Sequence, residues 1–171
     1  MYSFDDSTGI LNFYYGTPPS SNELHVGEIT DNGYYEQPEK VPWFAYIKEV
    51  RSVTFGDTFA KNRYESLSYW FYGMDKLTSI NLSGFSPRYV MNFSHAFEND
   101  NSLTSVKFFD GTNEALVDTK DTKFMFSGVG ACLKTVDFTG LKANGFVEDE
   151  RMFGDLESVH SIPEKFIFGD S

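Results

Sequence analysis

The chain has 171 residues, of which 40% are hydrophobic and 18% aromatic, with 18 Phe and 10 Tyr. This size and composition predict one folded domain with a phenylalanine-rich core and argue against a second full domain. The net charge of −11 comes from 25 acidic and 14 basic residues without a Lys/Arg cluster, which argues against nucleic acid and anionic membranes as partners. Basic or neutral partners fit this charge better.

Few residues in the chain suit covalent or metal chemistry. The only cysteine, Cys132, rules out an intrachain disulfide and a cysteine-rich zinc site. The three histidines, at positions 25, 95 and 160, lack the spacing of helical metal ligands. The sequence therefore predicts neither a metal site nor a cofactor.

The sequence also bears on location. No apolar run approaches the roughly 20 residues needed to span a bilayer, so no transmembrane segment is predicted. The start, MYSFDDSTG, has neither the basic nor the apolar region of a secretory signal. From these features alone we expect an intracellular protein, or a mature or trimmed piece of a longer one.

Residues 1–42 are predicted to form a small β-rich N-terminal cap. GILNFYYG is a β-rich run between glycines, ELHVGEI alternates apolar and polar residues, and DNGYY contains the Asn-Gly pair favoured in hairpin turns. A cap would shield the open end of the array that follows, because the ends of stacked repeats expose core. A separate ligand-binding subdomain is the alternative.

Residues 43–171 repeat one apolar pattern five times. Its first column is a phenylalanine that returns every 26 to 29 residues, at Phe44, Phe71, Phe97, Phe126 and Phe153. An apolar residue precedes each phenylalanine, at Trp43, Trp70, Ala96, Met125 and Met152. An aliphatic residue follows six or seven positions later, at Val50, Leu77, Leu103, Leu133 and Val159. Two strand-like columns come next: Val53, Ile80, Val106, Val136 and Ile162, and then Phe55, Leu82, Phe108 and Phe138.

This period predicts a leucine-rich-repeat solenoid of about five repeats of 26–30 residues, with one short strand in each. The return segments are expected to be irregular or to form short helices, as in RYESLSYWF, RYVMNFSHAF and VEDERMF. Pro163 and the final GDS are interpreted as a C-terminal cap. Residues 1–42 and 43–171 are thus the two parts of the predicted organisation.

The repeat FYGMDKLTSINLSGFSPRYVMNFSHAF, over 71–97, resembles the BspA-type leucine-rich-repeat proteins of bacterial surfaces. The likeness is looser over 43–70 and 125–162. The slot that holds a cysteine in that family is filled by Met74, Asp100, Val129 and Leu156. The resemblance implies export, display at the cell surface and a role in interaction or adhesion, and it implies no catalytic residues.

Two surfaces are candidate binding sites. Because side chains alternate along a strand, the residues next to the inward columns must point outward, and this face comprises Ser52, Thr54, Ser79, Asn81, Ser105, Lys107, Thr135, Asp137, Ser161 and Pro163. The hydroxyls of this face could instead be structural and pair across neighbouring strands. The second candidate is an aromatic patch of Tyr14, Tyr15, Tyr34 and Tyr35, which could dock a protein or stack on sugars.

The predicted function is a non-enzymatic, surface-displayed module that binds a protein or glycan of a host or a neighbouring cell. A structural spacer in a larger surface protein is the first alternative. The second is a carbohydrate-active enzyme, although the carboxylates of Asp5-Asp6 and Glu148-Asp149-Glu150 form no recognisable acid–base pair. No nucleophile motif, phosphate loop or dinucleotide fingerprint is present.

Overall fold

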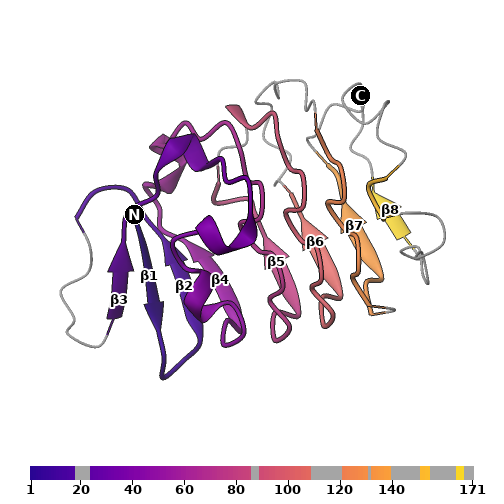
Figure 1. The fold of residues 1–171 in the computed structure, drawn as a ribbon, viewed down its shortest axis with the longest axis horizontal. Helices are drawn as coiled ribbons and strands as arrows, with labels where there is room; N and C mark the ends of the chain where they lie inside the picture. Colours follow the sequence, from indigo (N-terminus) through magenta and orange to yellow (C-terminus); the bar gives the residue numbers. More distant parts are fainter. Residues whose placement is uncertain are drawn as a thin grey trace.

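The computed structural model describes residues 1–17, 24–85, 89–108, 121–130, 132–139 and 151–154, and the backbone of 165–167. These residues form eight strands: β1 (Tyr2–Asp5), β2 (Ile10–Phe13), β3 (Leu24–Gly27), β4 (Ser52–Phe55), β5 (Ser79–Asn81), β6 (Ser105–Lys107), β7 (Thr135–Asp137) and β8 (Lys165–Ile167). They also form four short 3-10 helices: η1 (Asp31–Gly33), η2 (Pro38–Lys40), η3 (Phe44–Tyr46) and η4 (Phe59–Lys61). The strands lie side by side in one row across the molecule (Figure 1).

Two four-stranded sheets make up this row. The first has the order β3-β1-β2-β4 and is mixed, and the second has the order β5-β6-β7-β8 and is parallel throughout. β4 and β5 are neighbours at the junction of the two sheets (Figure 1). Each repeat thus contributes one strand to the row, and the strand of one repeat lies beside the strand of the next.

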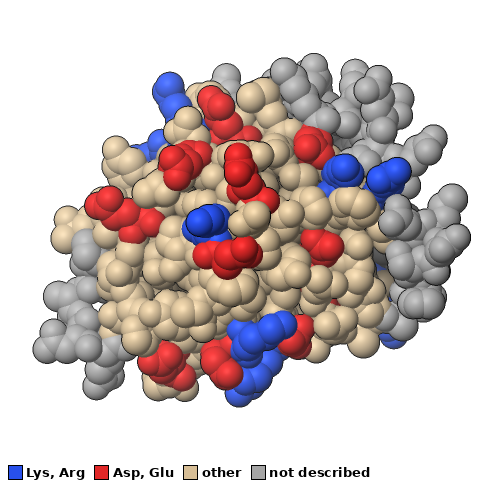
Figure 2. All heavy atoms as spheres, viewed as in Figure 1, with Lys and Arg blue, Asp and Glu red and all other residues tan. Residues whose placement is uncertain are grey.

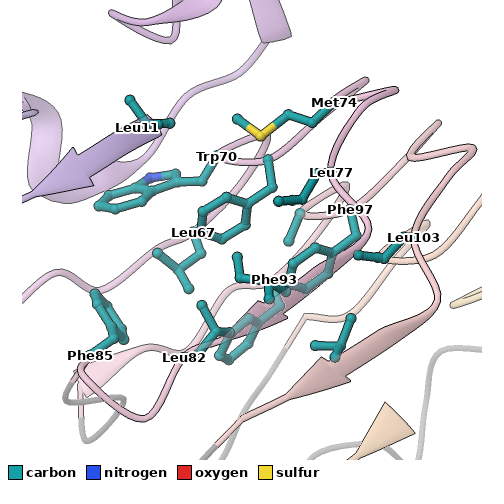
Figure 3. Close-up of a cluster of buried hydrophobic side chains, with 14 of the residues drawn as sticks. Leu11, Leu67, Trp70, Met74, Leu77, Leu82, Phe85, Phe93, Phe97 and Leu103 are labelled. Carbon is teal, nitrogen blue, oxygen red and sulfur yellow. The ribbon is translucent and has the colours of Figure 1, made fainter. Parts of the chain in front are cut away.

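The inward columns of the repeat form the core. In β5, β6 and β7 the alternation of buried and exposed residues follows a period of two, and Ile80, Val106 and Val136 are opposite one another and buried. The aliphatic column Val50, Leu77, Leu103 and Leu133 is also buried. Figure 3 shows Leu77, Leu82, Phe97 and Leu103 pointing into this shared interior.

The repeated phenylalanines stack on one another. The ring centroids lie 5.2 Å apart between Phe71 and Phe97, 5.4 Å between Phe97 and Phe126, and 5.7 Å between Phe126 and Phe153, with interplanar angles of 13°, 8° and 20°. These spacings are close to the roughly 4.8 Å that separates neighbouring strands, so one stacked ring fits each repeat. We call this column the phenylalanine ladder.

Main-chain hydrogen bonds join the turns that carry the phenylalanine ladder. The amides of Phe71, Phe97 and Phe126 donate to the carbonyls of Ala96, Met125 and Met152, at 3.0, 2.9 and 2.8 Å. Isolated parallel bridges also join Ser66 to Asn92 and Asn92 to Asp121. The repeats are therefore held together along their turns as well as along their strands.

Part of residues 1–42 continues the row instead of lying over its end. β2 runs parallel to β4, with Leu11 opposite Val53 and Phe13 opposite Phe55. The rings of Phe13 and Phe55 stack at 5.5 Å. β1 and β3 then add antiparallel strands on the far side of β2.

The first repeat departs from the expected pattern at Phe44, which is 36% exposed and lies in η3. Here the amide of Phe44 donates to Val41 within its own turn, and the indole Nε1 of Trp43 donates to the carbonyl of Trp70 at 2.7 Å. The side chain of Trp43 thus replaces the main-chain link seen in later repeats. Phe44 therefore does not join the phenylalanine ladder, although its spacing matches that of the later copies.

The return segments take the irregular form, one of the two forms expected: residues 63–71 and 91–97 have isolated bridges at Ser66 and Asn92, followed by turns. The expectation for the last strand is wrong. In the last repeat the backbone partner of Val136 is Phe166 and not Ile162, so the strand begins two residues after Pro163, which has no amide to donate to a ladder. Ile162, Ser161, the final GDS, and 147–150 of the VEDERMF run lie outside the described residues.

The phenylalanine ladder generates a stability prediction. Phe97→Ala should lower the free energy of unfolding by about 3–5 kcal/mol, because the ring is fully buried between Phe71 and Phe126 and its loss leaves a cavity. Urea denaturation followed by tryptophan fluorescence would measure the change. Phe44→Ala, the matched control at the exposed ring, should cost less than about 1 kcal/mol. Equal costs at the two positions would contradict the ladder.

Candidate functional site

The outward side chains of the central strands form the first candidate surface, which we call the sheet strip. Its members are Ser52 and Thr54 on β4, Ser79 and Asn81 on β5, Ser105 and Lys107 on β6, and Thr135 and Asp137 on β7. Ser79, Ser105 and Thr135 are direct partners in the ladder, as are Asn81, Lys107 and Asp137. The structure therefore aligns these two columns over β5 to β7.

β4 lies next to β5 but belongs to the other sheet, so its outward residues join the sheet strip without being paired to β5. Ser52 and Thr54 pair with Ile10 and Asn12 of β2, and the Thr54 hydroxyl donates to Oδ1 of Asn12 at 2.9 Å. Thr54 thereby extends the polar face toward the N-terminal strands.

The sheet strip is polar and shallow. Ser79, Asn81 and Thr54 are exposed, and the others are half-buried. Lys107 and Asp137 are opposite each other, where unlike charges on adjacent strands attract. Asn81 and Asp137 each accept the amide of the residue two positions later, Ser83 and Thr139, at 2.9 Å. Those two side chains therefore also close the turns that follow their strands.

The predicted tyrosine patch is divided by the fold. Tyr14 and Tyr35 are buried, and the Tyr14 hydroxyl donates to the carbonyl of Tyr2 at 3.1 Å. Tyr15 and Tyr34 are 55% and 47% exposed. The prediction of a four-tyrosine surface is therefore wrong for Tyr14 and Tyr35, which pack into the core.

A second surface on the turns was missed by sequence reasoning, and we call it the turn row. It consists of Tyr69, His95 and Phe124, which lie two residues before the core phenylalanines Phe71, Phe97 and Phe126. The ring centroids of Tyr69 and His95 lie 4.5 Å apart with an interplanar angle of 10°, and those of His95 and Phe124 lie 5.2 Å apart at 33°. The sequence signal for this surface was an aromatic residue two positions before each of these three phenylalanines.

Local hydrogen bonds shape the turns that carry the turn row. The side chains of Ser66, Asn92 and Asp121 each accept the amide two residues later, at 3.0, 2.7 and 2.9 Å. Short polar side chains form such turns readily. The residue that follows each turn, Tyr69, His95 or Phe124, has a positive φ of 60°, 57° or 56°. Left-handed backbone is costly for aromatic residues, so the stacked turns hold these residues in strained positions.

Charged groups lie beside the middle and the C-terminal end of the turn row. Nδ1 of His95 lies 2.6 Å from Oε2 of Glu98, and Lys123 Nζ lies 5.3 Å from the ring centroid of Phe124. Burial raises the pKa of the Tyr69 phenol, and Glu98, Tyr72, Tyr34 and Glu39 raise it further. Tyr69 therefore lies in an acidic and aromatic environment.

Asp100 is a buried carboxyl beneath these turns, in the slot that holds cysteine in the resembled family. Its Oδ1 accepts the amide of Met74 at 2.7 Å, whereas its Oδ2 is buried without a hydrogen-bond partner. Burial raises the pKa of Asp100 well above its usual range. The protonated form is favoured there, because an ionised oxygen without a partner is costly in the interior.

The carboxylates and histidines of the described residues are dispersed. Among them no group of three or more His, Cys, Asp or Glu side chains could hold a metal ion. Asp5 accepts hydrogen bonds from the amide and hydroxyl of Ser7, and Asp6 pairs with His25 at 2.6 Å, so both act within the cap. Glu148, Asp149 and Glu150 lie outside the described residues.

No helix among the described residues has the length and apolar character needed to cross a membrane.

Comparison with known proteins found no matching family model, no matching curated protein and no matching solved structure.

Asp100 generates a prediction about pH. The pKa of Asp100 is higher in the folded protein than in the unfolded chain. Below the unfolded pKa of about 3.9 the carboxyl is protonated in both states, and the full stability is present. As the pH rises toward the folded pKa, the unfolded chain releases this proton first, so the folded protein loses stability. Asp100→Asn should therefore match the wild type in acid and become more stable than it by up to about 1.4 kcal/mol per pH unit above pH 4. Thermal unfolding from pH 4 to 8 would measure this difference.

Asp57→Asn is the matched control, because it removes the same charge at an exposed site. Its pH profile should stay parallel to that of the wild type. A pH profile of Asp100→Asn that parallels the wild type would contradict the buried, protonated carboxyl.

Proposed function

We propose that the chain is a leucine-rich-repeat solenoid that serves as a non-enzymatic interaction module at a cell surface. In this proposal it binds a protein or glycan of a host or a neighbouring cell through the sheet strip. The observation that carries it is the alignment of outward polar side chains across β5, β6 and β7 on strands whose inward side chains are buried. Display at the surface rests on the resemblance to the BspA-type proteins.

The alignment supports recognition because the inward side chains that pack the core are distinct from the outward side chains that a ligand could contact. The inward residues Ile80, Val106 and Val136 are alike in size and chemistry, whereas their outward neighbours Asn81, Lys107 and Asp137 are an amide, a cation and an anion. Neighbouring strands hold these groups about 5 Å apart, a spacing suited to a short peptide or a chain of sugar rings. A surface of this kind can change its side chains while its backbone stays fixed.

A structural spacer is the alternative that one observation favours. Asn81 and Asp137 bind the amides of Ser83 and Thr139, so part of the sheet strip has a local structural role. A spacer needs only this role and would show no specific ligand. A binding screen separates the two functions.

The screen generates the functional prediction. The chain should bind a ligand in an array of glycans and matrix proteins, and isothermal titration should confirm the affinity. Introducing Ser79→Lys and Ser105→Lys together should lower the affinity for that ligand by at least about tenfold, because two long cationic side chains would cover the middle of the sheet strip. Circular dichroism should show an unchanged fold.

Ala45→Lys is the control, since it adds a cation at an exposed residue of η3, outside the sheet strip. It should leave the affinity within about twofold. Equal weakening by the control, or no effect of the paired lysines on a verified ligand, would reject the sheet strip as the binding face. A chain without any specific ligand would favour the spacer.

A further inference from the structure

The sequence contains two Asn-x-Ser triplets, Asn-Leu-Ser at 81–83 and Asn-Phe-Ser at 92–94. The first begins on the last residue of β5, and the second lies in the return segment that follows. Asn-x-Ser with a middle residue other than proline is the acceptor motif for N-linked sugars. Because so short a motif also arises by chance, the surroundings of each asparagine decide whether the folded chain can carry a sugar there.

The first triplet presents its asparagine to solvent. Leu82, in the middle, is buried and points into the interior (Figure 3), whereas Asn81 is exposed and Ser83 is half-buried. Oδ1 of Asn81 accepts the amide of Ser83 at 2.9 Å, which holds the two side chains on one turn. Neither Nδ2 of Asn81 nor the Ser83 hydroxyl has a hydrogen-bond partner among the described residues. The nitrogen that would receive a sugar therefore belongs to an open side chain and is free to react.

The second triplet is enclosed by its neighbours. Asn92 is half-buried and lies between Ser66 and Asp121 in the parallel bridges that join three return segments. Its Oδ1 accepts both the amide and the hydroxyl of Ser94 at 2.7 Å, and Ser94 is buried. A sugar is a bulky group that needs an open surface. The folded repeat therefore disfavours a sugar on Asn92.

We propose that Asn81 is the acceptor of an N-linked sugar. The donor is a sugar activated as a glycosyl diphosphate, a chemistry that lipid-linked and nucleotide-linked sugars share. In the transfer the bond between the sugar C1 and the diphosphate oxygen breaks, and a bond forms between C1 and Nδ2 of Asn81. Nδ2 gives one proton to a base of the transferase, and the diphosphate carrier leaves with the electron pair of the broken bond.

The position of Asn81 gives the modification a consequence for binding. Asn81 is opposite Lys107, and on the same face Ser79 is opposite Ser105. Neighbouring strands are about 5 Å apart, so a sugar on Asn81 would cover side chains of both strands. We therefore expect the sugar to exclude ligands from the middle of the sheet strip. This consequence rests on the proposed function, whereas the acceptor site does not.

Two samples test the acceptor with the two classes of donor. The folded chain made in bacteria is treated with a purified asparagine glucosyltransferase and UDP-glucose, and a second sample is secreted from mammalian cells behind an added signal peptide, where the donor is lipid-linked. The unmodified chain should be soluble, because acidic side chains are spread over the face seen in Figure 2. Peptide mapping by mass spectrometry should find a sugar on Asn81 in at least one sample and none on Asn92.

Later repeats supply matched variants for both asparagines. Asp137 and Asp121 occupy the places of Asn81 and Asn92, and each accepts the amide two residues later at 2.9 Å. Aspartate therefore keeps both turns but offers no nitrogen to a sugar. Asn81→Asp should abolish the modification, whereas Asn92→Asp should leave it unchanged. Ser83→Ala should abolish it as well, because the triplet is lost.

An unmodified Asn81 in both samples, or equal modification of Asn81 and Asn92, would overturn the proposal. The peptide map gives this result whether or not the chain has a ligand in the array, so failure of the acceptor site and failure of the proposed function are separate outcomes. Where the array yields a ligand, the modified chain should bind it at least about tenfold more weakly than the unmodified chain. Equal affinities would show that the sugar leaves the binding face open.

Discussion

The apolar columns of the repeat depend on one constraint, the main-chain hydrogen bond between successive turns. The amides of Phe71, Phe97 and Phe126 donate it. It fixes the distance between repeats near that of neighbouring strands, so a ring on one turn must stack on the ring of the next. Strand pairing between β5, β6 and β7 imposes the same distance on the opposite part of each repeat. With both parts fixed, every inward position must accept one apolar side chain per repeat, which is why the sequence repeats itself.

The same constraint accounts for the strained turn row. Tyr69, His95 and Phe124 keep a left-handed backbone because the turns on either side are already paired to their neighbours. Each such residue costs on the order of 1–3 kcal/mol, which glycine would avoid. Stacking between the three rings offsets part of this cost. Aromatic side chains at strained, partly exposed positions are therefore a feature that packing of the core alone does not require.

Sequence periodicity predicted the inward columns, because burial in a repeated frame leaves a strict apolar pattern. It failed where a side chain replaced a main-chain link, as at Trp43, and where Phe166 instead of Ile162 met Val136. The β-rich run that contains β2 was predicted, but its parallel pairing with β4, by which Leu11 and Phe13 continue the strand columns, was not. Burial of Tyr14 and Tyr35 depended on contacts between distant segments, which composition and spacing do not encode.

The two surfaces differ in how far the fold already uses their side chains. Alternation along the strands leaves every outward position of the sheet strip open to change, yet Asn81 and Asp137 also hold the amides of Ser83 and Thr139. A substitution there would disturb the turn as well as the surface, because a short side-chain acceptor is needed at that position. In the proposed function, the sheet-strip positions without such a local role are its hydroxyl column and Lys107. On the turns, by contrast, Tyr34 is exposed beside a backbone that the hydrogen bonds between Tyr35 and Ser68 hold in place, so its side chain can vary without loss of the frame.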